Sequence, residues 1–148
     1  MLNTASMFIS FYGRLEDKAA EFYEEMANNE KYSEGREAFR AFARESKRQK
    51  EMVLRTYREG ITDAFEGGFP LADLRESDYE IDTELRPNTS FSDALKMALS
   101  IEEKSRKFCA DASEGTRALA GISRAFESVA KQKAERKQKL ESLSGRKR

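Results

Sequence analysis

The strongest constraint on the fold of this 148-residue chain is an internal repeat. In residues 15–23 and again in residues 101–109, an apolar residue precedes a glutamate, and an aromatic residue follows that glutamate six positions later. A second pair of apolar patterns recurs in residues 39–53 and 126–140. The repeat predicts two copies of a helix pair, each with one glutamate facing inward. Such a bundle is suited to hold a pair of metal ions.

Apolar residues recur at intervals of three and four, which predicts four amphipathic helices. We expect the first over 4–27 and the second from an N-cap at Ser33 to about 67–68. The third is expected after Ser90, which has the capping-box spacing with Asp93, and the fourth after Thr116.

The lengths of the connections predict the topology. Only a few residues join the helices within each pair, which favours two antiparallel hairpins. About twenty residues, 66–89, separate the pairs, and an extended segment of that length reaches up to ~65 Å, enough to cross the bundle lengthwise. We therefore expect one domain over 1–148, an all-α antiparallel four-helix bundle of the ferritin-like type with one long crossover. Residues 144–148 are expected to form a frayed basic tail.

Composition narrows the classes of partner. Charged residues make up 36% of the chain, but its formal net charge is zero, so no overall field favours nucleic acid or a membrane. No apolar stretch approaches the ~20 residues of a membrane span. The single Cys109 excludes an internal disulfide and suits a reducing compartment. We expect a cytoplasmic protein without a secretory signal, and we interpret the basic residues after 131 as a solvated helix end.

The repeated segments resemble the ferritin-like domain of rubrerythrins, including small stand-alone members, over residues 8–143. In that family the first and third helices carry a Glu-x6-Tyr pattern, and the second and fourth carry Glu-x-x-His. The resemblance implies four helix faces that converge on two irons, with carboxylates bridging the ions and an imidazole on each. It also implies a homodimer.

Glu16 and Glu102 match the two single glutamates of the family. Tyr23 matches the tyrosine that follows the first, and Cys109 stands where the second tyrosine would be. We expect Tyr23 to pack beside the site and Cys109 to act as a small apolar side chain.

The other metal ligands of the family are replaced. The Glu-x-x-His positions hold Ser46 and Gln49 in the second helix, and Lys133 and Arg136 in the fourth. Since the chain contains no histidine, four of the six principal ligands of the resemblance are lost.

A different role follows from these replacements. Two inward carboxylates need counter-charges, which Lys133 and Arg136 can supply one turn apart, while Ser46 and Gln49 can donate hydrogen bonds. We expect a buried or half-buried ion-pair network in a non-catalytic structural or binding module, with no cofactor and a protein partner that the sequence does not identify.

Other interpretations remain. Shifting the second and fourth helices by one residue brings Glu45 and Glu135 toward the vestigial Glu16 and Glu102, as an oxygen-only site for Mn, Mg or Ca. The protein would then be a metal-binding oxidoreductase or iron-handling protein, of the peroxide-reducing or ferroxidase type, with a di-iron or manganese cofactor. The apolar pattern favours position 46 as the inward one, with Glu45 and Arg48 as an ordinary exposed pair. A third interpretation uses the basic C-terminal helix to dock a partner or nucleic acid.

Overall fold

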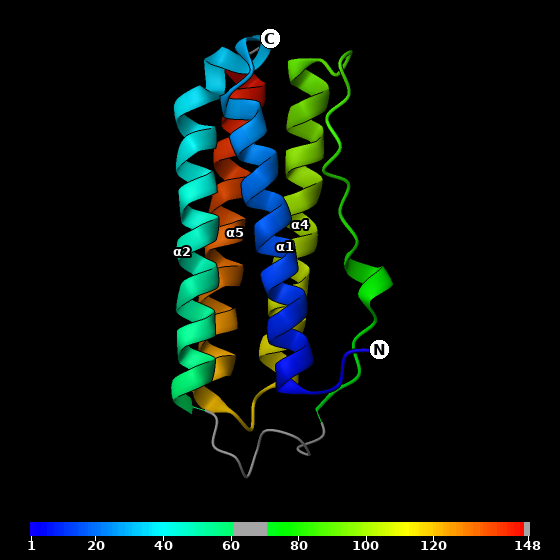
Figure 1. The fold of residues 1–148 in the computed structure, drawn as a ribbon, viewed down its shortest axis with the longest axis vertical. Helices are drawn as coiled ribbons and strands as arrows, with labels where there is room; N and C mark the ends of the chain where they lie inside the picture. Colours follow the sequence, from blue (N-terminus) through cyan, green and yellow to red (C-terminus); the bar gives the residue numbers. More distant parts are fainter. Residues whose placement is uncertain (61–70, 147–148) are drawn as a thin grey trace.

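Four long helices form the part of the protein that the structure describes (Figure 1). The computed structural model describes residues 1–60 and 71–146, and the side chains of all of these except residue 146. The all-helical class is confirmed, because within the described ranges the only strand-like feature is an isolated bridge between Leu2 and Leu74. The elements in chain order are α1 (Ala5–Ala27), η1 (Glu30–Gly35), α2 (Arg36–Gly60), η2 (Glu76–Tyr79), α4 (Phe91–Gly115) and α5 (Ala120–Arg146).

The helix starts follow from local capping. The Thr4 hydroxyl accepts a hydrogen bond from the backbone N–H of Met7, and Ser90 accepts one from Asp93, as the sequence predicts for Ser90. The expected cap at Ser33 is wrong, because that residue lies within η1 and α2 begins three residues later. The predicted end of the second helix, near 67–68, lies outside the described residues.

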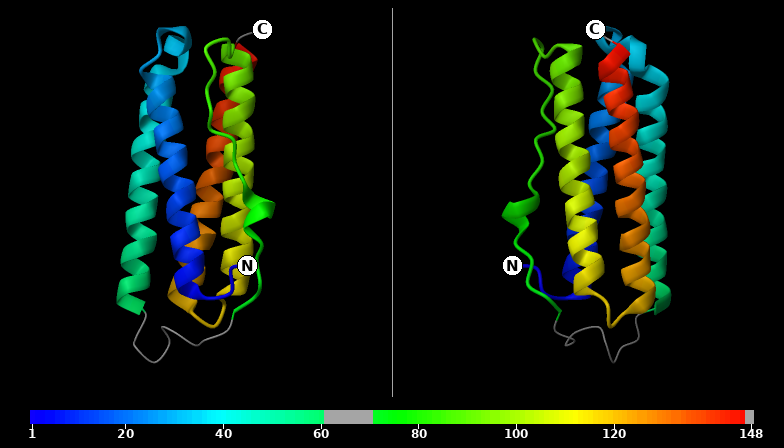
Figure 2. Two further views of the ribbon diagram at one scale, coloured as in Figure 1. Left: turned by 45° about the vertical axis from the view of Figure 1, so that its right-hand side comes forward. Right: turned by 180° about the vertical axis from the view of Figure 1, so that it is seen from behind.

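The colours of Figure 1 show the course of the chain: α1 ascends, α2 descends, α4 descends and α5 ascends. Residues 71–89, the described part of the expected crossover, run along the outside of α4 (Figure 2). Paired backbone hydrogen bonds of 2.7 and 2.8 Å between Leu2 and Leu74 hold one end of this segment. Residues 66–70 of the crossover lie outside the described part of the chain. At the C-terminus, α5 continues to Arg146, so helix covers the first three residues of the expected tail 144–148.

The interior consists of two apolar clusters with a polar layer between them. One cluster gathers aromatic residues such as Phe8, Phe108 and Phe126, and the other contains Phe22 and Phe39. Every long helix contributes to both clusters. Apart from Thr116 at the C-cap of α4, the buried polar residues lie between the two sets of apolar residues on each helix: Glu16, Ser46, Gln49, Glu102, Ser105, Lys133 and Arg136.

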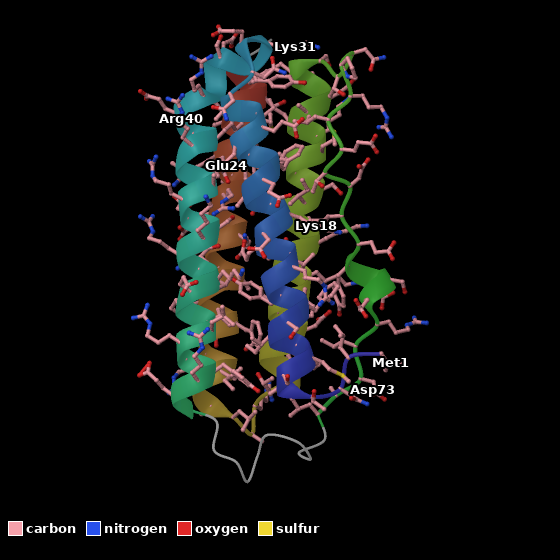
Figure 3. The ribbon with its side chains drawn as sticks, in the orientation of Figure 1. Met1, Lys18, Glu24, Lys31, Arg40 and Asp73 are labelled. Atoms are coloured by element: carbon pink, nitrogen blue, oxygen red, sulfur yellow. The ribbon has the colours of Figure 1, made fainter. Side chains whose placement is uncertain are left out.

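The outer faces carry most of the charge. Lys18, Glu24 and Arg40 lie on the surface of the bundle (Figure 3). None of the described helices combines the length and the apolar character that crossing a membrane requires.

Candidate functional site

The buried polar layer brings together charged side chains from three helices. Glu16 of α1 is 2% exposed and Glu102 of α4 is 0% exposed, while Lys133 and Arg136 of α5 are 0% and 2% exposed. All four lie at inward positions, in register with the apolar residues of their own helices. Charges at this depth are stable only when paired and hydrogen-bonded, so their contacts define the site.

Lys133 lies between the two inward glutamates. Its Nζ donates a hydrogen bond of 2.6 Å to Glu16 Oε1 and is 3.8 Å from Glu102 Oε1. The ammonium group therefore links α5 to both α1 and α4 through carboxylates that belong to the two halves of the internal repeat.

Arg136 makes the remaining ion pairs. Its Nη1 donates to Ser46 Oγ at 2.9 Å and to Glu102 Oε2 at 3.3 Å, and its Nη2 donates to Glu45 Oε2 at 3.2 Å. The guanidinium carbon also lies 5.1 Å from the ring centre of Phe42, within cation–π range. Burial opposes the charge of Arg136, but Glu102 and other nearby acidic groups raise its pKa above the ordinary value, so the side chain stays protonated.

Two tyrosines donate further hydrogen bonds to the glutamates, while Glu102 Oε1 has no hydrogen-bond partner in the described part of the chain. The Tyr12 hydroxyl donates to Glu16 Oε2 and the Tyr23 hydroxyl donates to Glu102 Oε2, both at 2.5 Å. Burial, followed by the charge of the bonded glutamate, raises the pKa of each tyrosine well above 10.0, so both act as protonated donors. Sequence reasoning missed Tyr12, although its position four residues before Glu16 places it on the same helix face.

Ser46 and Gln49 differ from the expectation that both donate to the ionic cluster. Ser46 instead accepts a hydrogen bond from Arg136. Gln49 Nε2 does donate, but its acceptor is Gln132 Oε1 on α5, at 2.5 Å, rather than a member of the cluster. Gln132 was not identified from the sequence as a partner, because it lies at an exposed position where periodicity carries no signal.

The competing register can also be located in the structure. Ser46 and Gln49 are buried, whereas the Glu45 side chain is 30% exposed and Glu135 is exposed. The expectation that Glu45 forms an ordinary exposed pair with Arg48 is wrong, since Glu45 pairs with the buried Arg136. Glu45 thus joins the cluster through its ion pair with Arg136.

No described group of three or more His, Cys, Asp or Glu side chains is arranged to hold a metal ion. In the buried layer, each of the two repeat-related glutamates instead has cationic nitrogen within ion-pair distance. Three carboxylates share two cations, and the two tyrosine hydroxyls supply further hydrogen bonds to them. The arrangement can tie helices together through charge. Lys133 Nζ, both Arg136 Nη atoms and the two tyrosine hydroxyls are already engaged as donors, whereas Arg136 Nε has no hydrogen-bond partner among the described residues.

Cys109 lies at the inner face of α4 and is fully buried. Burial, followed by the charge of Glu16, raises the pKa of its thiol well above the ordinary value. A protonated, enclosed thiol is a poor nucleophile, so Cys109 contributes packing to this region.

Comparisons of the chain with protein-family models, with curated proteins and with solved structures give no match, so the geometry above carries the functional argument.

Proposed function

We propose that this chain is a rubrerythrin-like, antiparallel ferritin-like bundle in which an ion-pair network replaces the di-iron centre. On this proposal it is a non-catalytic structural or binding module. The observation that carries the proposal is the position of Lys133 Nζ, 2.6 Å from Glu16 and 3.8 Å from Glu102. A fixed cation at that point neutralises the same two carboxylates that a metal would bridge.

The residues present do not fit a di-iron pair. Iron sites of this type need several carboxylates and an imidazole on each ion. Here the two positions on α5 carry an ammonium and a guanidinium, which repel metal cations, and the two on α2 carry a hydroxyl and an amide. The lysine nitrogen also donates to Glu16, which removes a lone pair that a metal would use.

Such a network would set how the helices are aligned. Lys133 joins α5 to α1 and α4, and Arg136 joins α5 to α4 and α2. A buried ion pair adds little net stability compared with a well-packed apolar core, because both charges must lose their water. Its benefit is specificity: sliding one helix by a turn would separate the charges from their partners.

Metal content after loading tests the proposal. The protein would be incubated anaerobically with Fe(II) or Mn(II), desalted and measured by mass spectrometry for metal per chain. We expect close to none. A content of about two ions per chain would contradict the proposal and restore the metal-binding oxidoreductase or iron-handling alternative.

A matched variant makes this test sharper. Lys133→Ala removes the cation that lies between Glu16 and Glu102, so the variant should retain more Mn(II) than the wild type. Lys131→Ala, on the exposed face of the same helix, is the control and should behave like the wild type. Circular dichroism would establish that each variant is helical before metal is added.

A further inference from the structure

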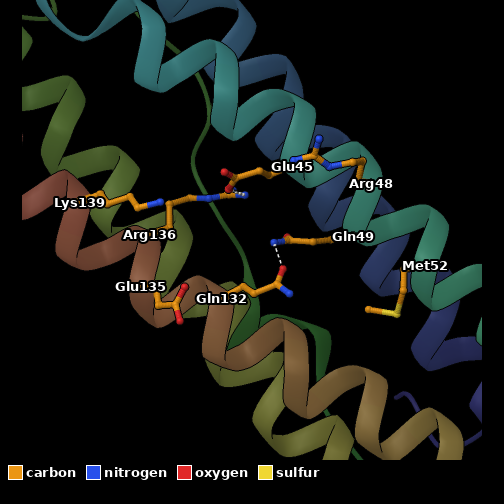
Figure 4. A pocket seen from close by; sticks show the side chains of 8 residues that line it. All are labelled: Glu45, Arg48, Gln49, Met52, Gln132, Glu135, Arg136 and Lys139. Atoms are coloured by element: carbon orange, nitrogen blue, oxygen red, sulfur yellow. Dashed lines mark hydrogen bonds and ion pairs between the residues drawn. The ribbon is translucent and has the colours of Figure 1, made fainter.

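A cavity of about 460 Å³ lies between α2 and α5, and it reaches from the surface to the buried network (Figure 4). Its wall includes exposed side chains such as Arg48 and Lys139 together with the buried Gln49 and Arg136. This volume is in the range of small-molecule sites, which span roughly 300–1,000 Å³. The cavity is separate from the space between Glu16 and Glu102 that Lys133 fills.

The charges of the wall favour an anion. Three cations line the cavity, Arg48, Arg136 and Lys139, against two carboxylates, Glu45 and Glu135. Among the described residues, Arg48 and Lys139 have no ion-pair partner, so their charge is available to a ligand. Guanidinium groups bind planar carboxylates through two parallel hydrogen bonds, which favours a carboxylate over a spherical anion.

Two buried polar atoms of the wall residues lack a hydrogen-bond partner among the described residues. They are Arg136 Nε, a donor, and Gln49 Oε1, an acceptor. Gln49 is 6% exposed and its Nε2 is already engaged with Gln132, so its remaining hydrogen-bonding capacity is that of an acceptor. A buried polar group without a hydrogen-bond partner has lost its bonds to water without replacing them, so a ligand that satisfies these atoms gains affinity.

We propose that this cavity binds a small organic carboxylate that also carries a hydrogen-bond donor, such as a hydroxyl group. The carboxylate lies toward Arg48, Lys139 and Arg136 Nε, and the donor group faces Gln49. The proposal goes beyond the function proposed above, because the network holds the helices whether or not the cavity is filled.

Glu45 gives the site an internal competitor. Its carboxylate is 3.2 Å from Arg136 Nη2, and its side chain is 30% exposed at the cavity wall. It therefore provides the kind of contact that an incoming carboxylate would make, and it repels that carboxylate. Neutralising Glu45 should tighten ligand binding, whereas removing Arg48 or Lys139 should weaken it.

Calorimetric titration of the full chain at low salt tests the site, with glycolate as the probe and acetate as the analogue that lacks a donor. We expect saturable glycolate binding that weakens by about fivefold in Arg48→Gln and in Lys139→Gln. Binding should tighten in Glu45→Gln, and acetate should bind more weakly than glycolate. Arg55→Gln is the control, because Arg55 is exposed two turns further along α2 and lies outside the cavity wall; it should bind like the wild type.

Several results would overturn the proposal. These are no saturable binding, an equal loss in Arg55→Gln, or unchanged affinity in Glu45→Gln. Tighter binding of inorganic phosphate than of glycolate would assign the cavity to another class of anion and would also refute it. None of these results bears on the metal content of the wild type or of Lys133→Ala, so the two proposals can fail independently.

Discussion

Two ion clusters on α4 and α5 use residues that are almost neighbours, yet they lie in different surroundings. Glu102 and Glu103 are adjacent in sequence, and Lys133 and Lys137 are one helical turn apart. The inner pair is buried, with Lys133 and Glu102 both at 0% side-chain exposure. The outer pair is accessible, with Lys137 at 30% and Glu103 at 42%.

Distance does not distinguish the two clusters. Lys133 is 2.6 Å from Glu16 within the inner cluster, and Lys137 is 2.8 Å from Glu103 in the outer one. What differs is the environment left behind when a partner is removed. Water can solvate Glu103 when its partner is removed. Water cannot reach the buried Glu102 unless the core opens. Similar geometry therefore predicts very different consequences of mutation.

The largest expected effect comes from removing Lys133, the cation that lies between Glu16 and Glu102. Lys133→Met keeps much of the side-chain volume but leaves Glu16 and Glu102 without their shared charge, and it should lower the free energy of unfolding by about 3–5 kcal/mol. Lys137→Met, the outer counterpart, should cost less than about 1 kcal/mol. Denaturant unfolding of the two variants, monitored by circular dichroism, measures the contrast.

A compensating change checks the cause. If the loss in Lys133→Met comes from uncompensated negative charge, adding Glu16→Gln should recover part of it, because the amide oxygen still accepts from Tyr12. A double variant that is no more stable than Lys133→Met would refute this explanation and would indicate that packing, rather than charge, is lost. Equal effects for Lys133→Met and Lys137→Met would remove the distinction between the clusters.

The second-largest expected loss of stability comes from removing a tyrosine hydroxyl that donates to a buried glutamate. Tyr23→Phe removes the 2.5 Å hydrogen bond to buried Glu102 and should cost about 1.5–3 kcal/mol, since bonds to charged groups are the stronger ones. Tyr79→Phe is the matched comparison, because its hydroxyl donates at 2.6 Å to Asp111 in a part-buried setting. We expect Tyr79→Phe to lower the free energy of unfolding by less than Tyr23→Phe does.

The raised pKa of Tyr23 gives this prediction a pH dependence. A tyrosine that stays protonated in the folded protein stabilises it fully below pH 10.0, and this contribution declines as pH rises from there toward the higher folded pKa. The advantage of the wild type over Tyr23→Phe should therefore shrink above pH 10.0. An advantage that grew in alkali would contradict the assigned donor role.

The positions of the inner cluster could be read from the sequence, but much of its bonding could not. The apolar positions before and after Glu16, Ser46, Glu102 and Lys133 require these residues to face inward, because a helix repeats its faces every three or four residues. Periodicity says nothing about which donor meets which acceptor. It therefore did not indicate that Arg136 reaches Glu45, a contact that depends on the separation of two helices and on the length of the arginine side chain.

The fold, too, was predictable from the sequence only where local patterns determine it. The four helices and the cap at Ser90 follow from local patterns. The start of α2 did not, because Asn29 caps a short helical turn ahead of it, and Ser33 looked equally suitable as a cap in the sequence alone. The cavity between α2 and α5 was likewise not predictable, since it depends on the spacing of helices that are not consecutive in the chain.

The smallest expected effect is the acid response of the outer cluster. Hydrogen bonds from Arg106 and then Lys137 lower the pKa of Glu103 from 4.5 to about 2. A lowered folded pKa means that Glu103 stabilises the protein above pH 4.5 and loses this contribution as pH falls toward 2. The stability difference between the wild type and Glu103→Gln should therefore be small near neutral pH and should close over that interval. Salt should reduce the difference at neutral pH, because the outer charges are screened. A stability difference that persisted at pH 2, or that did not depend on salt concentration, would show that Glu103 behaves like the buried glutamates. It would contradict the distinction between the inner and outer clusters.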